Sequence, residues 1–90
     1  MKETTKKIDQ AKNRFLEWLE QNEATDVDVY VGEENQDGWS YYRHVSAFVG
    51  NKFYSVYFMQ WKGGEPKIDY RDWTNRYNGL SVGEFYKLLD

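Results

Sequence analysis

The sequence predicts a single α+β domain, with an N-terminal and a C-terminal helix on one face of an antiparallel sheet of three to four strands. Three observations predict it: an apolar stripe of helical spacing before residue 22, period-two alternation through the middle of the chain, and a helix-capping sequence near the end. The 90 residues contain no repeat, low-complexity tract or linker, so residues 1–90 are treated as one domain.

The first element is expected to be a helix from about Thr5 to Asn22. Its apolar residues recur three or four positions apart, as on one side of an α-helix. They are Ile8, Ala11, Phe15, Trp18 and Leu19. Thr4 or Thr5 is the candidate N-cap, because a threonine hydroxyl can accept a hydrogen bond from a free amide of the first turn.

A first strand is expected at Val27–Val31, where three valines alternate with Asp28 and Tyr30. Side chains of a strand point alternately to its two faces, so this pattern is typical of a half-buried strand. The polar run 35–38, which ends in Gly38, then predicts a turn.

Two longer strands are expected at Trp39–Val49 and Lys52–Lys62, joined by the two-residue turn Gly50-Asn51. This turn fixes the pairing, with His44 opposite Tyr57, and so divides the side chains between two faces. One face, which suits the core, carries Tyr41, Arg43, Val45, Ala47, Val49, Tyr54, Val56 and Phe58. The other face carries Tyr42, His44, Ser46, Phe48, Phe53, Ser55, Tyr57, Met59 and Trp61.

A short fourth strand is expected at Lys67–Trp73, after the break at Gly63-Gly64. Pro66 at its start favours an edge position, because proline has no amide hydrogen to donate to a sheet. Asn78-Gly79 is expected to form a turn.

The last element is expected to be a helix at Val82–Leu89. Ser81 and Glu84 have the spacing of a capping box, in which each side chain bonds the backbone amide of the other residue. Leu80 and Phe85 occupy the positions of a hydrophobic staple around that cap.

Composition argues against several classes of protein. The chain has no cysteine, hence no disulfide and no thiolate metal site. It shows no apolar run of signal-peptide or membrane-span length, so we expect a soluble, cytoplasmic protein with no membrane partner. The net charge is −3, but eight carboxylates and no base lie between Glu17 and Asp37. Such an acidic surface would speed encounter with a protein that carries a basic surface.

Catalytic and metal sites have little support. His44 is the only histidine, and the sequence offers no cysteine nucleophile and no Gly-x-Ser-x-Gly elbow. The pattern Glu33-x-Asn35-x-Asp37-Gly38 is similar to the first half of a calcium loop, but His44 stands at its twelfth position, where a glutamate is required. No metal or cofactor is predicted, and an enzyme with His44 as general base is the last of three hypotheses.

The aromatic face is the most informative feature, because exposed aromatic and Met side chains are enriched at protein interfaces. We therefore expect a small non-catalytic binding protein, such as an inhibitor, adaptor or accessory protein of the kind that phages and other mobile elements encode. Its expected contact residues are Tyr42, His44, Tyr57, Met59 and Trp61 as anchors, with Glu33, Glu34 and Asp37 as steering charges.

Two alternatives use the same face. Its aromatic rings, with Arg43, Lys52, Lys62, Lys67, Arg71 and Arg76 around them, could stack single-stranded nucleic acid. Alternatively the face is covered, either by residues 65–79 with Trp73 and Tyr77 packed onto it, or by a second copy in a homodimer.

Overall fold

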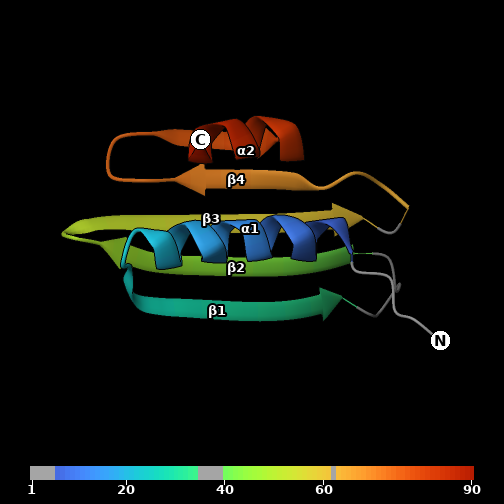
Figure 1. The fold of residues 1–90 in the computed structure, drawn as a ribbon. Coiled ribbons are helices and arrows are strands. Elements are labelled where there is room, and N and C mark those ends of the chain that lie inside the picture. The colour runs from blue at the N-terminus through green and yellow to red at the C-terminus, as the bar shows by residue number, and fades with distance from the viewer. Residues whose placement is uncertain (1–5, 35–39, 62) are drawn as a thin grey trace.

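The computed structural model describes residues 6–34, 40–61 and 63–90, which form two helices and five strands (Figure 1). The elements are α1 (Lys7–Gln21), β1 (Thr25–Glu34), β2 (Ser40–Val49), β3 (Lys52–Trp61), β4 (Lys67–Arg71), β5 (Arg76–Leu80) and α2 (Val82–Leu89). The strands form one antiparallel sheet in chain order, β1-β2-β3-β4-β5. The predicted α+β architecture is confirmed, with five strands in place of three or four.

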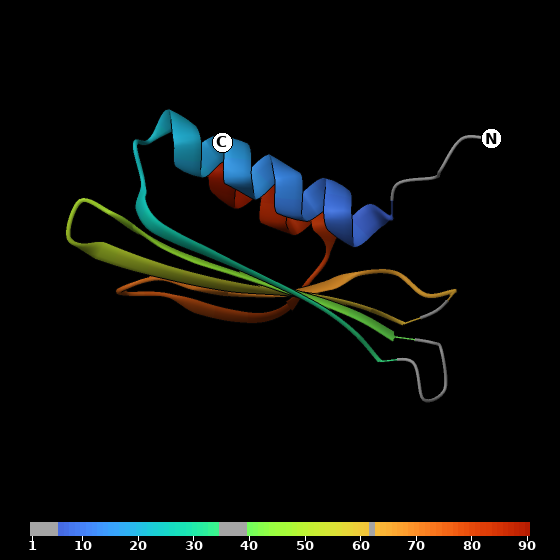
Figure 2. The same ribbon diagram turned by 90° about the horizontal axis from the view of Figure 1, so that it is seen from below.

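Both helices lie on the same face of the twisted sheet, as the sequence predicts (Figure 2). Helix α1 packs on β2 and β3, and α2 packs on β4 and β5 (Figure 1). Within the described residues, neither helix packs on β1. The sheet therefore has a covered face, an uncovered face, and one edge strand that lies outside the helix layer.

Helix α1 buries the predicted stripe. Its buried residues are Ile8, Ala11, Phe15 and Leu19, and Trp18 packs against the core from the margin. The helix begins at Lys7, and the N-cap position is Lys6, which makes no side-chain capping bond. The candidate caps Thr4 and Thr5 lie outside the described residues.

The core lies between the helices and the covered face of the sheet. Phe15 of α1, Phe58 of β3 and Phe85 of α2 are fully buried and meet at its centre. Their ring centroids lie 6.4 Å (Phe15–Phe58), 5.8 Å (Phe15–Phe85) and 5.5 Å (Phe58–Phe85) apart. Each such ring stabilises the fold by about 1.5–3 kcal/mol through the apolar area that it removes from water. One aromatic triangle thus joins both helices to the sheet.

An ion pair between a buried arginine and a partly buried aspartate holds α1 to the β1 end of the sheet. Arg43 of β2 is only 3% exposed, and it donates to Asp9 of α1 through Nε (2.7 Å to Oδ1) and Nη2 (3.3 Å to Oδ2). Its Nη1 donates to the backbone oxygens of Gly32 and Tyr42. Burial works to raise the pKa of Asp9, but the hydrogen bond and charge of Arg43 outweigh it and hold that pKa below its ordinary value.

The central hairpin has the register that Gly50-Asn51 predicts. His44 pairs with Tyr57 and Val45 with Val56, and the pairing runs without a shift from Ser40–Trp61 to Val49–Lys52. Gly50 has φ +66°, as the first central position of a type II′ turn requires. Because the register holds, the division of side chains between two faces is also confirmed.

The last part of the sheet differs from the prediction. Residues 76–80 form a fifth strand, so Asn78-Gly79 lies inside β5 and is not the turn between elements. The turn is instead at Asp72, whose Oδ1 accepts from the amides of Thr74 (2.8 Å) and Asn75 (2.6 Å). An aspartate that bonds the backbone two and three residues on stabilises such a turn.

Strand β4 lies inside the sheet and not at its edge, because β5 pairs with it. Pro66 stands one residue before β4, outside the ladder, where its missing amide hydrogen leaves no bond unmade.

Helix α2 begins as the capping sequence predicts. Glu84 N donates to the Ser81 hydroxyl (3.2 Å), and Ser81 N donates to Glu84 Oε1 (2.9 Å). Leu80 packs against the same core as Phe85. With 15 residues in α1 and eight in α2, neither described helix has the length and apolar character needed to cross a membrane.

Candidate functional site

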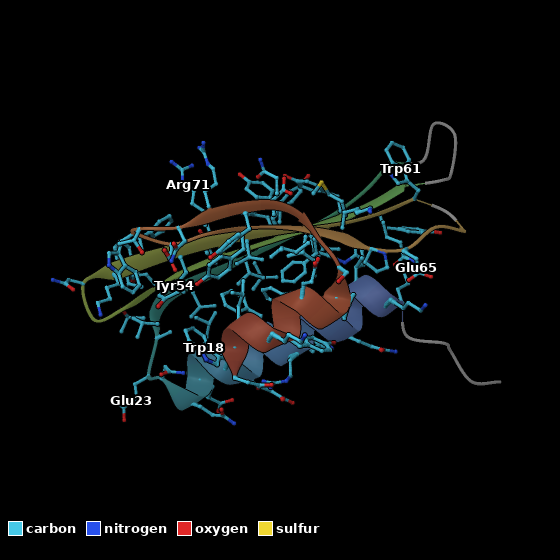
Figure 3. The ribbon with its side chains drawn as sticks, turned by 90° about the horizontal axis from the view of Figure 1, so that it is seen from above. Trp18, Glu23, Tyr54, Trp61, Glu65 and Arg71 are labelled. Atoms are coloured by element: carbon cyan, nitrogen blue, oxygen red, sulfur yellow. The ribbon has the colours of Figure 1, made fainter. Side chains whose placement is uncertain are left out.

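The face of the sheet turned away from the helices, here called the open face, carries the candidate site. Its large side chains are Tyr30 of β1, Tyr42, His44 and Phe48 of β2, and Phe53, Tyr57, Met59 and Trp61 of β3. Tyr30 is 59% exposed, Trp61 52% and Tyr57 37%. Trp61 and Arg71 project from this side, opposite the helices (Figure 3).

The rings of the open face contact one another across three strands. Tyr30 meets Tyr42 at 6.0 Å between centroids, Tyr42 meets Tyr57 at 5.8 Å, and His44 stacks on Tyr57 at 4.1 Å. Phe48 and Phe53 form a separate pair at 5.0 Å beside the hairpin turn. Cross-strand aromatic pairs of this kind hold side chains in fixed positions and each contribute roughly 0.2–1 kcal/mol. The rings of Tyr30, Tyr42, His44 and Tyr57 are therefore in contact with one another before any partner binds.

His44 is held between a hydroxyl and a ring. Its Nε2 lies 2.9 Å from Ser55 Oγ, and the imidazole stacks on Tyr57. Partial burial lowers the pKa of His44, and the negative charge of Asp28 opposes that shift without cancelling it. The lowered pKa favours the uncharged imidazole, which suits a contact with an apolar partner surface.

A shallow hollow lies beside His44 where β1 meets β2. It has a volume of about 240 Å³ and is lined by Asp28, Val29, Tyr30, His44 and Ser46. Polar side chains also occur elsewhere on the open face, where Lys67, Asp69 and Arg71 of β4 lie opposite Met59, Tyr57 and Ser55. The face is thus an aromatic surface with an acidic residue at its β1 side and charges of both signs along β4.

The structure brings five of the predicted contact residues together. Tyr42, His44, Tyr57, Met59 and Trp61 lie on the open face, on adjacent strands. Glu33 and Glu34 end β1. Their side chains, and the whole of Asp37, lie outside the described part of the chain.

Two further residues lie on this face, Asp28 and Tyr30, which were not among the predicted contact residues. Tyr30 pairs with His44 and Asp28 pairs with Ser46, so both side chains lie on the open face. Their alternation with the valines was visible in the sequence. What was missing was the register between β1 and β2, because the five-residue connection 35–39 does not fix the pairing as a two-residue turn does.

Residues 65–79 do not cover the open face. They extend the sheet as β4 and β5, and their aromatic side chains turn to the helix side. Trp73 meets Tyr54 edge to face at 5.7 Å, and Tyr77 lies against Tyr70 at 6.1 Å, with Tyr54 and Tyr70 both in the core. The alternative in which Trp73 and Tyr77 pack onto the aromatic face is therefore wrong, because the chain continues along the sheet and forms a fifth strand beside β4.

Two of the bases predicted around the open face lie elsewhere. Arg43 is buried on the covered face with Asp9, and Lys52 places its Nζ 4.4 Å from the ring of Trp73. Lys62 is outside the described residues. Lys67, Arg71 and Arg76 remain, of which Lys67 and Arg71 face Met59 and Ser55.

Within the described residues, no three His, Cys, Asp or Glu side chains gather as a metal site would require. The His44 imidazole contacts Ser55 but makes no hydrogen bond to Asp28 in the described structure, so these three residues do not form a linked nucleophile, base and carboxylate.

The chain was compared with protein families, curated proteins and solved structures, and none of the three comparisons found a match.

Proposed function

We propose that this protein is a non-catalytic interaction module that binds another protein through the open face. One observation carries the proposal: a cluster of large rings, fixed by contacts with each other, stays exposed on a face that neither helix covers. Contiguous apolar patches on monomeric proteins are usually small, and larger ones mark binding surfaces.

The composition of the open face supports a protein partner. Tyr, Trp and Met are enriched in interfaces, and residues whose truncation weakens binding by about 2 kcal/mol or more are most often Trp, Tyr and Arg. The open face combines Trp61, Tyr57 and Tyr42 with Arg71 at its β4 side. Because Tyr42 and Tyr57 already contact neighbouring rings, binding would cost them little side-chain entropy.

The same face gives single-stranded nucleic acid weaker support. The exposed rings of Tyr57 and Trp61 could stack on bases, and Lys67 and Arg71 lie on the neighbouring strand. However, Asp28 and Asp69 lie on the same face, and Arg43 is engaged with Asp9 in the core. We therefore place a protein partner first.

The proposal is tested with a double variant, Tyr57→Ala with Trp61→Ala, compared with Leu88→Ala. Leu88 is an exposed apolar residue on α2, so it controls for loss of surface area without touching the open face. Partner proteins captured from cells by the wild type and by Leu88→Ala should be lost with the double variant, whose circular dichroism should stay unchanged. Retention of the same partners, or unfolding of the double variant, would contradict the proposal.

Two measurements separate the alternatives. Single-stranded DNA at about 50 mM salt should show no binding, whereas a nucleic-acid protein would bind there and weaken steeply as salt rises. Sedimentation of the wild type should give a monomer. A dimer that Tyr57→Ala and Trp61→Ala together dissociate would show that a second copy covers the open face.

A further inference from the structure

The outer edge of β1 is a second surface without a partner in the described part of the chain. β1 is the terminal strand of the sheet, and it runs for ten residues, from Thr25 to Glu34. A terminal strand presents unpaired backbone amides and carbonyls on its outer side, and these can pair with a strand of another chain.

The two edges of the sheet differ in how well they are protected. β5, at the opposite edge, has five residues, a register shift against β4 and a glycine at φ +70°, and it leads directly into α2. Short length and irregularity are features that discourage strand addition. β1 is irregular only near its start, where the register shifts between Thr25 and Asp28 and Asp26 has φ +53°, and from Asp28 on it pairs regularly with β2.

On the helix side, β1 exposes an apolar row. Val29 and Val31 pair with Val45 and Arg43, which lie on the covered face, yet the two valines are 44% and 53% exposed. They stay exposed because α1 packs on β2 and β3 and leaves β1 outside the helix layer (Figure 1). A strand added beside β1 would bury these side chains with its own apolar residues.

On the open side, the same strand is acidic and aromatic. Asp28 and Tyr30 line the hollow of about 240 Å³ beside His44. A carboxylate next to a tyrosine ring suits a lysine or arginine, through charge and through a cation over the ring. Neither Lys nor Arg occurs in the sequence of β1.

From these two rows we infer that β1 accepts an extended segment of another protein in which apolar residues alternate with Lys or Arg. Side chains of an added strand alternate between the faces of the sheet, whichever its direction. Its apolar residues would extend the row of Val29 and Val31, and its basic residues would lie beside Asp28 and Tyr30. This surface shares Tyr30 and the hollow beside His44 with the open face, but it does not include Tyr57 or Trp61, so either proposal can fail without the other.

A second copy of this chain is a poor occupant for the same edge. Asp26 and Asp28 are both exposed. If β1 paired with β1 of a second copy, the two aspartates of each copy would bring four carboxylates to the interface between the strands. Like charges opposite one another destabilise paired strands. A basic strand removes this repulsion, which is why the inference specifies a partner of opposite charge.

The test uses two synthetic peptides of ten residues, the length of β1, one alternating valine with lysine and one alternating valine with glutamate. The valine–lysine peptide should bind, shift the amide NMR signals of β1 and slow their hydrogen exchange, whereas the valine–glutamate peptide should not bind. Asp28→Lys should weaken the valine–lysine peptide by about tenfold and favour the other peptide. Glu17→Lys, the same charge change on an exposed residue of α1, should leave both affinities unchanged.

A further variant tests the apolar row. Val29→Thr with Val31→Thr keeps β-branched side chains and should weaken the valine–lysine peptide by several-fold while preserving the fold. No binding of the valine–lysine peptide, equal binding of both peptides, or signal changes confined to Tyr57 and Trp61 would overturn the inference. So would a dimer of the wild type that the Val29→Thr and Val31→Thr variant dissociates.

Discussion

Tyr57 and Phe58 are neighbours in β3 and have rings of nearly the same size, but they meet opposite environments. Phe58 is fully buried between α1 and α2, whereas Tyr57 is 37% exposed on the open face. The hairpin is rich in aromatic residues on both sides, so hydrophobicity alone does not separate the two faces. They differ because the open face places Ser46, Ser55 and Asp69 among its rings and because both helices pack on the other side. An aromatic face can therefore stay in water when its rings pack on each other and polar residues lie between them.

Replacing Tyr57 and Phe58 in turn by alanine should give the largest difference in stability. Phe58→Ala should lower the free energy of unfolding by about 3–5 kcal/mol, because it leaves a cavity between Phe15 and Phe85. Tyr57→Ala removes contacts with Tyr42 and His44 but leaves no buried cavity, so it should lower that energy by about 1 kcal/mol or less. Urea denaturation of both variants measures the difference, and equal losses would mean that the open face belongs to the core.

The ion pair of buried Arg43 with partly buried Asp9 differs from the exposed pair of Lys7 with Glu65. Asp9→Ala leaves the guanidinium of Arg43 buried without its carboxylate and should lower the free energy of unfolding by about 3 kcal/mol. Glu65→Ala breaks an ion pair with Lys7 in which both side chains are more than half exposed, and it should change that energy by less than about 1 kcal/mol. Thermal unfolding measures the stability of the two variants. A larger loss of stability in Glu65→Ala than in Asp9→Ala would contradict the prediction that the Asp9 ion pair contributes more.

The Asp9 ion pair also predicts a dependence on pH. The pKa of Asp9 is lower in the folded protein than the ordinary value of about 4, so its contribution is complete above that value and is lost as pH falls through the folded pKa. Asp9→Asn should therefore destabilise the protein more at pH 6 than at about pH 2. A destabilisation that does not change between these pH values would show that the charge of Asp9 is not involved.

The cap of α2 should have a smaller effect than either core change. Ser81→Ala removes the hydroxyl that accepts from Glu84 N and should lower the free energy of unfolding by about 0.5–2 kcal/mol. Ser81→Asp keeps an acceptor at this position and serves as the matched variant. The cap would be unimportant if both substitutions gave the same loss in urea denaturation.

The smallest expected effect on stability comes from the protonation of His44. Burial lowers its pKa below about 6.5, so stability is greatest above that pH and declines as pH falls from it to the folded pKa. Asp28→Asn should lower the pKa further, because it removes the negative charge that favours the imidazolium. An NMR titration of the imidazole protons measures both values, and a pKa that rises in Asp28→Asn would contradict this arrangement.

Local signals in the sequence placed much of the fold. Gly50-Asn51 set the register of β2 and β3, and Ser81 with Glu84 set the start of α2, because each depends only on residues a few positions apart. They could not show β5, whose residues are exposed except for Leu80 and lack the alternation of a half-buried strand. They also placed the turn at Asn78-Gly79, since Asn-Gly is a turn signal, whereas the side chain of Asp72 forms the actual turn.

Local patterns in the chain are sufficient to predict the α+β order, the helical stripe that includes Phe15, and the division of the central hairpin into two faces. Which surfaces remain in contact with water depends on the packing of distant elements. Residues 65–79 form β4 and β5 beside β3, so they leave Tyr57 and Trp61 uncovered. Helix α1 packs on β2 and β3, so Val29 and Val31 of β1 lie outside the helix layer. Periodicity shows which side chains share a face, but burial depends on which distant element packs against that face.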